Sequence, residues 1–454
     1  MNTSIRSRLL KAAAGLEVTD EFERAIEAIE LAGDNVFITG RAGTGKSTLL
    51  TLFRAITDKQ IAVVAPTGAA AINVGGQTLH SFFRFPPHPP SQFDIRKSDN
   101  AELYRSLDAL VIDEVSMVRA DLMDAIDKFL RINRGKKSRP FGGVQMIMIG
   151  DLFQLPPVVK TESEVRHIEL YHGTPHFFGS TALQAAGMQT IELKRIYRQQ
   201  DLAFVEALNA IRSGRVSDGH LALLNSRVED TFDFGADDPA VLLTPTNRVA
   251  SRVNGQRLGQ ISGAHTVFEA QVTEKFGHVP ENQRPAPTRL QVKVGAHVMF
   301  IRNDRDRRWV NGTMGRVAEI EEDSIRVVIT DDDSDGASHW VNMETWEMYE
   351  YGVGEEKSEL EMEVVGTFTQ FPLRLGYAIT IHKGQGKTLD HAIVDMGRGA
   401  FAPGQTYVAL SRVRSLDGLV LTRPISRDDV KVDRDVVAFL EEGIVPSAVQ
   451  RRLF

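Results

Sequence analysis

The sequence predicts an α/β protein built on parallel sheets, with a separate β-rich region inserted late in the chain. Four short apolar runs each lie between helical or polar segments, which is typical of buried parallel strands. Over residues 253–365 helical periodicity fades and β-like pieces alternate with charged turns, after which helical and strand patterns resume. The apolar runs are VFIT (36–39), IAVVAP (61–66), ALVID (109–113) and QMIMIG (145–150).

Composition narrows the classes of function. The 454 residues suit two to four domains, and 42% hydrophobic with 25% charged residues is typical of a globular protein. The absence of cysteine excludes disulfides, thiolate zinc sites, cysteine nucleophiles and cysteine-ligated iron–sulfur clusters. No apolar run approaches the ~20 residues that cross a bilayer. A net charge of -7 argues against a protein that coats nucleic acid, but it does not exclude a nucleic-acid channel with a locally basic lining.

The first sixteen residues carry basic groups and no acidic ones. Two interpretations remain open, a transit-like targeting segment or a basic first helix, and a secretory signal is excluded by the broken apolar portion.

The segment GRAGTGKST (40–48) is a phosphate-binding loop, because it follows a predicted strand and opens a predicted helix. Its glycines let the backbone amides wrap around phosphates at a helix N-terminus. Lys46 reaches the β- and γ-phosphates, and the Ser47 hydroxyl is a magnesium ligand. The predicted nucleotide-binding residues of the loop are Gly40, Gly43, Thr44, Gly45, Lys46, Ser47 and Thr48.

A second motif, LVIDEVSMV (110–118), places two carboxylates after a buried strand. Ligands bind at this edge of parallel sheets. Asp113 suits magnesium coordination, and Glu114 suits the base that deprotonates an attacking water. An acidic pair at a helix N-terminus is the structural alternative.

A third motif, IGDLFQLPPV (149–158), carries Gln154, whose amide both donates and accepts and therefore suits a sensor of the γ-phosphate. In the same segment, Asp151 is predicted to be a turn or cap residue. Arginines in KRIYRQQ (194–200) and YVALSRVRS (407–415) are candidates for a finger that neutralises transition-state charge.

These motifs together resemble the PIF-type (petite integration frequency) DNA helicases of superfamily 1, which are related to the RecD-like enzymes. They occur in the family's order and span residues 40–421. The remaining segments that carry the resemblance are APTGAAAINVGGQTLHSFF (65–83), YRQ (197–199) and ITIHKGQGKTLD (379–390).

The resemblance implies two RecA-like P-loop NTPase domains, with ATP and Mg²⁺ between them and an inserted small β-rich domain of SH3-like type. It implies 5′→3′ translocation on single-stranded DNA by a monomeric motor that acts at single-strand/duplex junctions, in DNA repair, recombination or telomere maintenance. It places the protein in a bacterial-type cytoplasm, or in the nucleus or mitochondria of a eukaryote. The predicted domains are 1–190 with a wedge-like insertion at about 75–103, 191–252 with 366–425, the insertion 253–365, and a tail 426–454.

Roles carry over position by position. The resemblance assigns hydrolysis to Lys46, Asp113, Glu114, Gln154, Arg198 and Arg412, and magnesium to Ser47 and Asp113. It adds Gln385 and Gly386 to the nucleotide site. The predicted DNA-binding residues are Thr67, Gly68, His80, Phe82, His382 and Lys383, with Phe82 open to a core role because aromatic rings dominate cores.

One departure concerns the base of the nucleotide. Family members carry a glutamine about 17 residues before the phosphate loop, where an amide reads adenine, and this sequence has Phe22-Glu23 there. Other nucleoside triphosphates therefore remain possible substrates. Two further functions stay open: a DNA-stimulated ATPase switch without unwinding, and an RNA helicase, which would use 2′-hydroxyl contacts.

Overall fold

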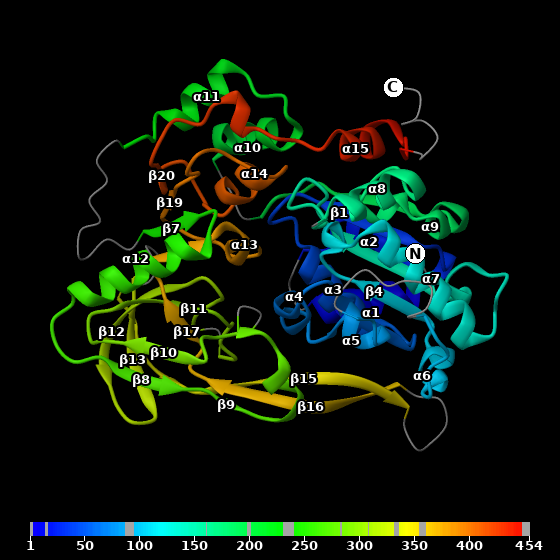
Figure 1. The fold of residues 1–454 in the computed structure, drawn as a ribbon, viewed down its shortest axis with the longest axis horizontal. Coiled ribbons are helices and arrows are strands. Elements are labelled where there is room, and N and C mark those ends of the chain that lie inside the picture. The colour runs from blue at the N-terminus through cyan, green and yellow to red at the C-terminus, as the bar shows by residue number, and fades with distance from the viewer. Residues whose placement is uncertain are drawn as a thin grey trace.

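The computed structural model describes residues 3–13, 17–86, 95–159, 161–197, 201–229, 240–281, 284–306, 308–330, 336–353 and 360–446. Two parallel sheets and a β-rich region make up this part of the chain (Figure 1). The predicted α/β class is confirmed. None of the helices described is long and apolar enough to span a membrane.

The first sheet has six parallel strands in the order β3-β2-β4-β5-β1-β6. The four predicted apolar runs supply β1, β2, β4 and β5, and these strands are almost wholly buried because helices cover both faces of the sheet. The strands are β1 (Val36–Gly40), β2 (Ile61–Ala65), β3 (Gln77–Thr78), β4 (Ala109–Ile112), β5 (Gln145–Gly150) and β6 (Gln189–Leu193).

Several helices of this half follow directly from strand ends. Helix α3 starts at Lys46, immediately after the loop that leaves β1, and α4 starts at Gly68 after β2. The helices are α1 (Thr3–Ala13), α2 (Asp20–Glu27), α3 (Lys46–Ile56), α4 (Gly68–Asn73), α5 (Leu79–Phe83), α6 (Ala101–Ser106), α7 (Ala120–Arg134), α8 (Glu162–Tyr171) and α9 (Thr181–Ala186).

The second sheet is parallel, in the order β18-β7-β19-β20. Its neighbouring strands β7 and β18 are separated in sequence by the β-rich region. The strands are β7 (Val241–Thr244), β18 (Ala378–Thr380), β19 (Ala392–Val394) and β20 (Leu419–Leu421). The helices around it are α10 (Leu202–Ser213), α11 (Asp218–Asn225), α12 (Asn247–Gln260), α13 (Ile381–Gly384) and α14 (Gln405–Leu410).

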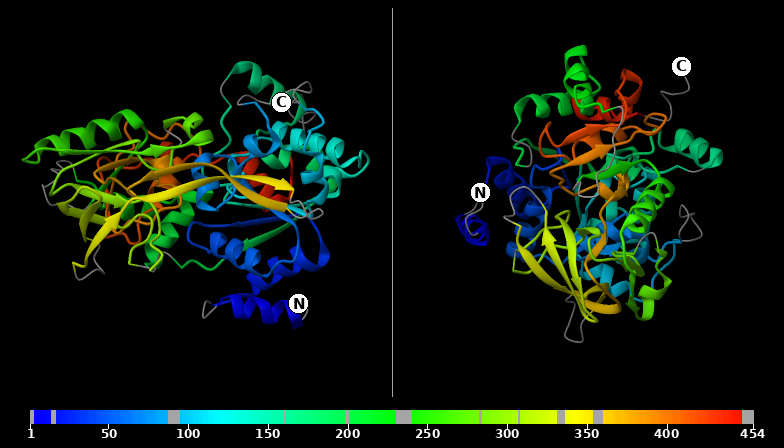
Figure 2. Two further views of the ribbon diagram at one scale, coloured as in Figure 1. Left: turned by 90° about the horizontal axis from the view of Figure 1, so that it is seen from below. Right: turned by 90° about the vertical axis from the view of Figure 1, so that its left-hand side faces the viewer.

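The β-rich region is built on a five-stranded antiparallel sheet, β14-β13-β12-β11-β17, with β10-β8 and β15-β16-β9 beside it. A long hairpin, β15–β16, runs from this region back to the first sheet, where β15 contacts α4, α6 and β3 (Figure 2). The strands are β8 (Thr266–Glu269), β9 (Gln271–Val272), β10 (Arg289–Val292), β11 (His297–Phe300), β12 (Met314–Ile320), β13 (Ser324–Ile329), β14 (Ser338–Asn342), β15 (Glu344–Val353), β16 (Leu360–Gln370) and β17 (Leu373–Leu375). The SH3-like type of this region stays a prediction.

The domain boundaries remain our proposal, and the strand pairing favours moving three of them. Helix α12 crosses the predicted boundary at 252/253 yet packs on β7 and β18. At the other end, β17 follows residue 365 but pairs with β11. The last strand of the first sheet, β6, extends past residue 190. We therefore propose 261–376 for the inserted region.

The C-terminal segment ties the second half of the chain back to the first (Figure 1). After β20 the chain reaches α15 (Arg434–Val437) and the short turn Ala438–Glu442, beside α8 and α9. Phe439 stacks on Phe178 with ring centroids 4.1 Å apart. Asp433 accepts a hydrogen bond from the fully buried His176 at 2.9 Å. This segment therefore acts as a strap between the two halves.

Replacing Phe439 with alanine should lower the midpoint of thermal unfolding by about 2–4 °C, because the buried Phe178 ring loses its stacking partner and a gap is left beside it. Thermal unfolding followed by circular dichroism measures the shift. Phe401, whose side chain is 62% exposed, supplies the control, and Phe401→Ala should shift the midpoint by less than about 1 °C. Equal shifts for the two variants would contradict the strap.

Candidate active site

The phosphate loop takes the shape that its glycines permit. Gly43 and Gly45 have φ of 80° and 85°, in the left-handed region that side chains disfavour. Gly40 is confined, since a Cβ there would lie 2.6 Å from Thr44 Oγ1 and 2.8 Å from Leu193 O. The loop between β1 and α3 therefore presents backbone amides toward the start of α3.

Lys46 is a buried cation without a carboxylate in hydrogen-bond contact. Its Nζ donates to Gly40 O at 2.7 Å and to Arg41 O at 2.9 Å, both carbonyls of the loop itself. Burial lowers its pKa, although the charges of Asp151 and Glu114 act in the opposite direction. A phosphate oxygen would restore a full ionic partner, so the residues present fit a nucleoside triphosphate.

The carboxylates Asp113 and Glu114 follow β4, as predicted. Burial raises the pKa of Asp113. Burial, together with the charge of Asp113, raises the pKa of Glu114 to about 7. Glu114 also has φ of 50°, a strained conformation for a residue with a side chain. Two adjacent carboxylates that are costly to ionise fit a divalent cation, with Ser47 as a further oxygen ligand.

A glutamine from the second half reaches the carboxylates of the first. Gln385, just after α13, donates from Nε2 to Gln154 Oε1 at 2.9 Å and to Glu114 Oε2 at 3.3 Å. Gln154 is buried and donates in turn to Asp151 Oδ2 at 3.4 Å. Gln385, from the second half of the chain, therefore lies between the predicted base Glu114 and the predicted γ-phosphate sensor Gln154.

Asp151, which the sequence indicated only as a turn or cap residue, is the centre of a buried network. Its carboxylate is fully buried and accepts from Arg212 Nη2 at 3.0 Å and from Tyr407 Oη at 3.2 Å. The Tyr407 hydroxyl accepts the backbone N–H of Ala42, in the phosphate loop, at 3.1 Å. The Asp–Arg pair joins the end of β5 to α10, a contact that no local motif signals.

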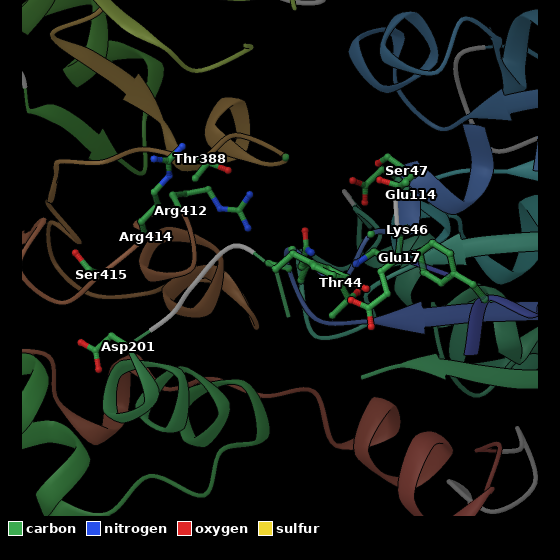
Figure 3. A pocket seen from close by; sticks show the side chains of 18 residues that line it. Glu17, Thr44, Lys46, Ser47, Glu114, Asp201, Thr388, Arg412, Arg414 and Ser415 are labelled. Atoms are coloured by element: carbon green, nitrogen blue, oxygen red, sulfur yellow. The ribbon is translucent and has the colours of Figure 1, made fainter. Parts of the chain in front are cut away.

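Part of this arrangement lines one cleft of about 820 Å³ between the two halves, whereas Gly40, Asp113 and Gln385 are not among its lining residues. Figure 3 shows Lys46, Ser47 and Glu114 on one side of the cleft, and Thr388, Arg412 and Arg414 on the other. Ten predicted residues line it: Gly43, Thr44, Gly45, Lys46, Ser47, Thr48, Glu114, Gln154, Gly386 and Arg412. Lining residues that the predicted site lacks are Glu17, Phe22, Ala42, Tyr197, Asp201, Thr388, Arg414 and Ser415. Phe22 lies in the segment where the resemblance leads us to expect a glutamine, and its ring lies 3.0 Å from where a Cβ of Gly45 would be.

Of the two predicted finger arginines, Arg412 is 1% exposed and faces the cleft, and its charge lowers the pKa of Glu114. Its guanidinium is positioned by Val408 O at 2.9 Å and by Ser411 Oγ at 2.7 Å. The other, Arg198, lies outside the described residues.

The predicted DNA-binding residues sit at the carboxyl ends of strands in both sheets. Thr67 caps α4 after β2, with Gly68 as its first residue, and His80 lies in α5 after β3. His382 and Lys383 are exposed in α13 after β18. Their contacts with DNA stay a prediction.

The assignment of Phe82 to base stacking is wrong. Its side chain is only 3% exposed and packs edge-on against Phe83 and Tyr104, whose hydroxyl donates to Phe82 O at 2.7 Å. The ring is part of the core because α5 turns its apolar face toward the sheet. The wedge-like insertion predicted at about 75–103 thus begins with core elements, and residues 87–94 lie outside the described part.

Comparison with known proteins agrees with this geometry. A family model described as PIF1-like helicase matches residues 17–220. The ATP-dependent DNA helicase Pif1 of Bdellovibrio bacteriovorus is 33% identical over 414 residues, which is 89% of this chain and 88% of the relative. The chain belongs to the PIF1-like helicase family. Human ATP-dependent DNA helicase PIF1 is also 33% identical, over 89% of this chain and 60% of the human protein.

Solved structures of Bacteroides Pif1 fall into two groups by their similarity to this chain. A Bacteroides Pif1 in complex with ADP-AlF4 matches with a TM-score of 0.86 and 35% identity, over 94% of this chain and 98% of that one. The same helicase bound to single-stranded DNA has 34% identity but a TM-score of 0.66, over 94% and 97% of the two chains. Because identity and coverage barely differ, the two groups differ in how their parts are arranged, and this PIF1-like chain has the arrangement of the first.

Because the pKa of Glu114 is raised to about 7, the carboxylate is protonated below that pH and cannot act as a base. We expect kcat/KM for ATP hydrolysis, which reports the groups of the free enzyme, to rise about tenfold between pH 6 and pH 8. Steady-state kinetics at ATP concentrations well below KM measure the profile. The exposed Glu162 supplies a control, and Glu162→Gln should leave the profile unchanged. A flat wild-type profile would exclude Glu114 as the titrating base.

Removing Arg212 leaves Asp151 buried without a cation, and Arg212→Met should lower the thermal midpoint by about 5 °C or more. Adding Asp151→Asn removes the stranded charge, so the double variant should recover most of the loss. Differential scanning calorimetry of the four members of the cycle tests this. Additive losses in the double variant would show that the pair is not coupled.

Proposed function

We propose that this chain, an ATP-dependent DNA helicase by family, hydrolyses ATP in the cleft between its two parallel sheets and thereby moves 5′→3′ along single-stranded DNA. The observation that carries the proposal is the composition of the cleft. The first half supplies the phosphate loop and Glu114, and the second half supplies Arg412, with Gln385 bonded to Glu114. A site divided in this way is complete only when both halves hold the nucleotide, so hydrolysis controls their separation.

The residues divide the chemistry of hydrolysis. The loop amides and Lys46 hold the phosphates, and Ser47 and Asp113 hold Mg²⁺, which supplies charge neutralisation when bound. Glu114 takes the proton of the attacking water, while Gln154, held by Gln385, orients the γ-phosphate. Arg412 neutralises charge that develops in the transition state. Arg198 shares that role in the proposal, on the resemblance alone.

The DNA strand is proposed to cross the carboxyl ends of both sheets, along Thr67, Gly68, His80, His382 and Lys383. Segment 382–388 then carries DNA contacts and, through Gln385, a contact to Glu114. Because the single-strand-bound relative differs in arrangement while the ADP-AlF4 complex does not, we propose that the strand moves the β-rich region and stimulates hydrolysis. Maintenance of structured or branched DNA follows as the proposed role.

Lys46→Ala should abolish ATP turnover, while Glu114→Gln should retain nucleotide and DNA binding and lower kcat at least a hundredfold, since the base alone is removed. A coupled phosphate-release assay and fluorescent-nucleotide binding separate the two effects. Lys128 is exposed on α7, and Lys128→Ala is the control that should match the wild type. Normal turnover by Glu114→Gln would overturn the assignment of the base.

Arg412→Ala should lower kcat at least a hundredfold with little change in ATP affinity, because the contact strengthens in the transition state. Arg248, exposed on α12, supplies the control Arg248→Ala. The function itself is tested by unwinding of fluorescent DNA and RNA duplexes with a 5′ or a 3′ single-stranded tail. Unwinding of the 5′-tailed DNA supports the proposal, whereas ATP hydrolysis without strand separation, or preference for RNA, would contradict it.

A further inference from the structure

Three basic side chains lie where the β-rich region meets the second sheet: Arg374 on β17, Lys383 in α13, and Lys387 just after α13. The backbone brings these elements together, because Leu373 on β17 pairs with Phe300, and Gly312, whose N–H donates to Phe300 O, packs against Lys387. Burial lowers the pKa of both lysines, and the charge of Arg374 lowers each of them further. Such a cluster costs free energy unless a negative charge balances it.

Lys387 is the most buried of the three, with 8% of its surface exposed. Its ammonium donates to Asn311 Oδ1 at 2.5 Å, a neutral amide oxygen in the loop between β11 and β12. An ammonium has three donors, and this contact uses one of them. Burial, together with Arg374, lowers the pKa of Lys387 to about 7. Among the described residues, this buried ammonium is held by a neutral amide and has no carboxylate acting on it to balance its charge.

Arg374 is half-buried, and its guanidinium makes little use of its hydrogen-bond donors. Its Nη2 donates to Pro285 O at 3.5 Å, the limit for a hydrogen bond, and its Nε is buried without a hydrogen-bond partner. In the described part of the chain, the carboxylate whose charge affects the cluster is that of the exposed Glu281. Its charge partly opposes the lowering of the Lys383 pKa. The charged neighbour that acts on Lys387 is Arg374, another cation.

We propose that Arg374 and Lys387 form a binding site for a phosphate group of the nucleic-acid strand, a site that rests on the proposed function. A guanidinium and an ammonium without acidic partners match a phosphodiester, and Lys383 with His382 forms the exposed rim through which the strand would approach. The nucleotide's own phosphates are a poorer match. Gly386 and Thr388 line the cleft, whereas the Lys387 side chain between them bonds to Asn311 of the β-rich region.

The test uses Arg374→Met and Lys387→Met in the full chain, with fluorescence anisotropy of a labelled oligothymidine over a salt series. Each variant should weaken binding about tenfold or more, and the slope of log affinity against log salt should become shallower by about 0.7. The thermal midpoint should hold or rise, since a poorly balanced charge has been removed. The matched controls are Arg326→Met on β13, where the arginine is half-buried like Arg374, and Lys128→Met on α7, where the lysine is exposed; both should bind as the wild type does.

Each outcome decides the matter. Wild-type affinity and salt slope in both variants would overturn the site and leave the proposed function standing. Failure of the wild type to bind the oligonucleotide would overturn the site and the proposed function together. A lowered thermal midpoint with unchanged DNA affinity would give Lys387 a purely structural role and overturn the site. If inorganic phosphate at matched ionic strength raises the thermal midpoint of the wild type but not of the variants, and the variants bind DNA as the wild type does, the site binds phosphate but not the DNA strand. That result would overturn its assignment to the strand.

Discussion

The fully buried carboxylate of Asp151 fixes how the two halves of this protein meet. It ends a central strand of the first sheet and binds Arg212 and Tyr407, both from helices of the second half. Through the Tyr407 hydroxyl it also reaches the phosphate loop at Ala42. A buried ion pair adds little net stability to a fold, but removing one partner is costly. The Asp151–Arg212 pair therefore selects one arrangement of the two halves rather than adding much to their stability. The cleft takes its shape around this contact.

Burial gives the cleft its chemistry. Lys46 loses basicity and Glu114 loses acidity for the same reason, since each is costly to charge away from water. In the proposed mechanism a triphosphate and a divalent cation would supply the missing counter-charges to the two kinds of group. The raised pKa of Glu114 suits a base that works near neutral pH.

The sequence predicted the parallel strands and the phosphate loop because both leave local patterns. Buried parallel strands are continuous apolar runs, and the loop's glycines have fixed spacing. The Asp151–Arg212 pair and the Phe439–Phe178 stack leave no local pattern in the sequence, since each joins residues more than 60 positions apart in the chain. Phe82 was ambiguous because an aromatic ring suits a core as well as a base stack. Spacing alone did not select Arg412, whereas burial beside Glu114 supports it.

The single-strand-bound relative has a lower TM-score than the ADP-AlF4 complex, and this difference is the ground for our proposal that DNA changes the arrangement of the present chain. The β-rich region is joined to the second sheet by two chain connections, which follow α12 and β17, so the proposed movement leaves the strand pairing of both parallel sheets intact.

Because the chain has no cysteine, spin labels can be placed at two chosen sites, Lys128→Cys on α7 and Asp323→Cys between β12 and β13, both exposed. Pulsed electron paramagnetic resonance then measures the distance between the labels. We expect oligothymidine to shift the distance distribution, and ADP with aluminium fluoride alone to leave it unchanged. A distance distribution that does not change with DNA would contradict the proposed DNA-dependent movement of the β-rich region.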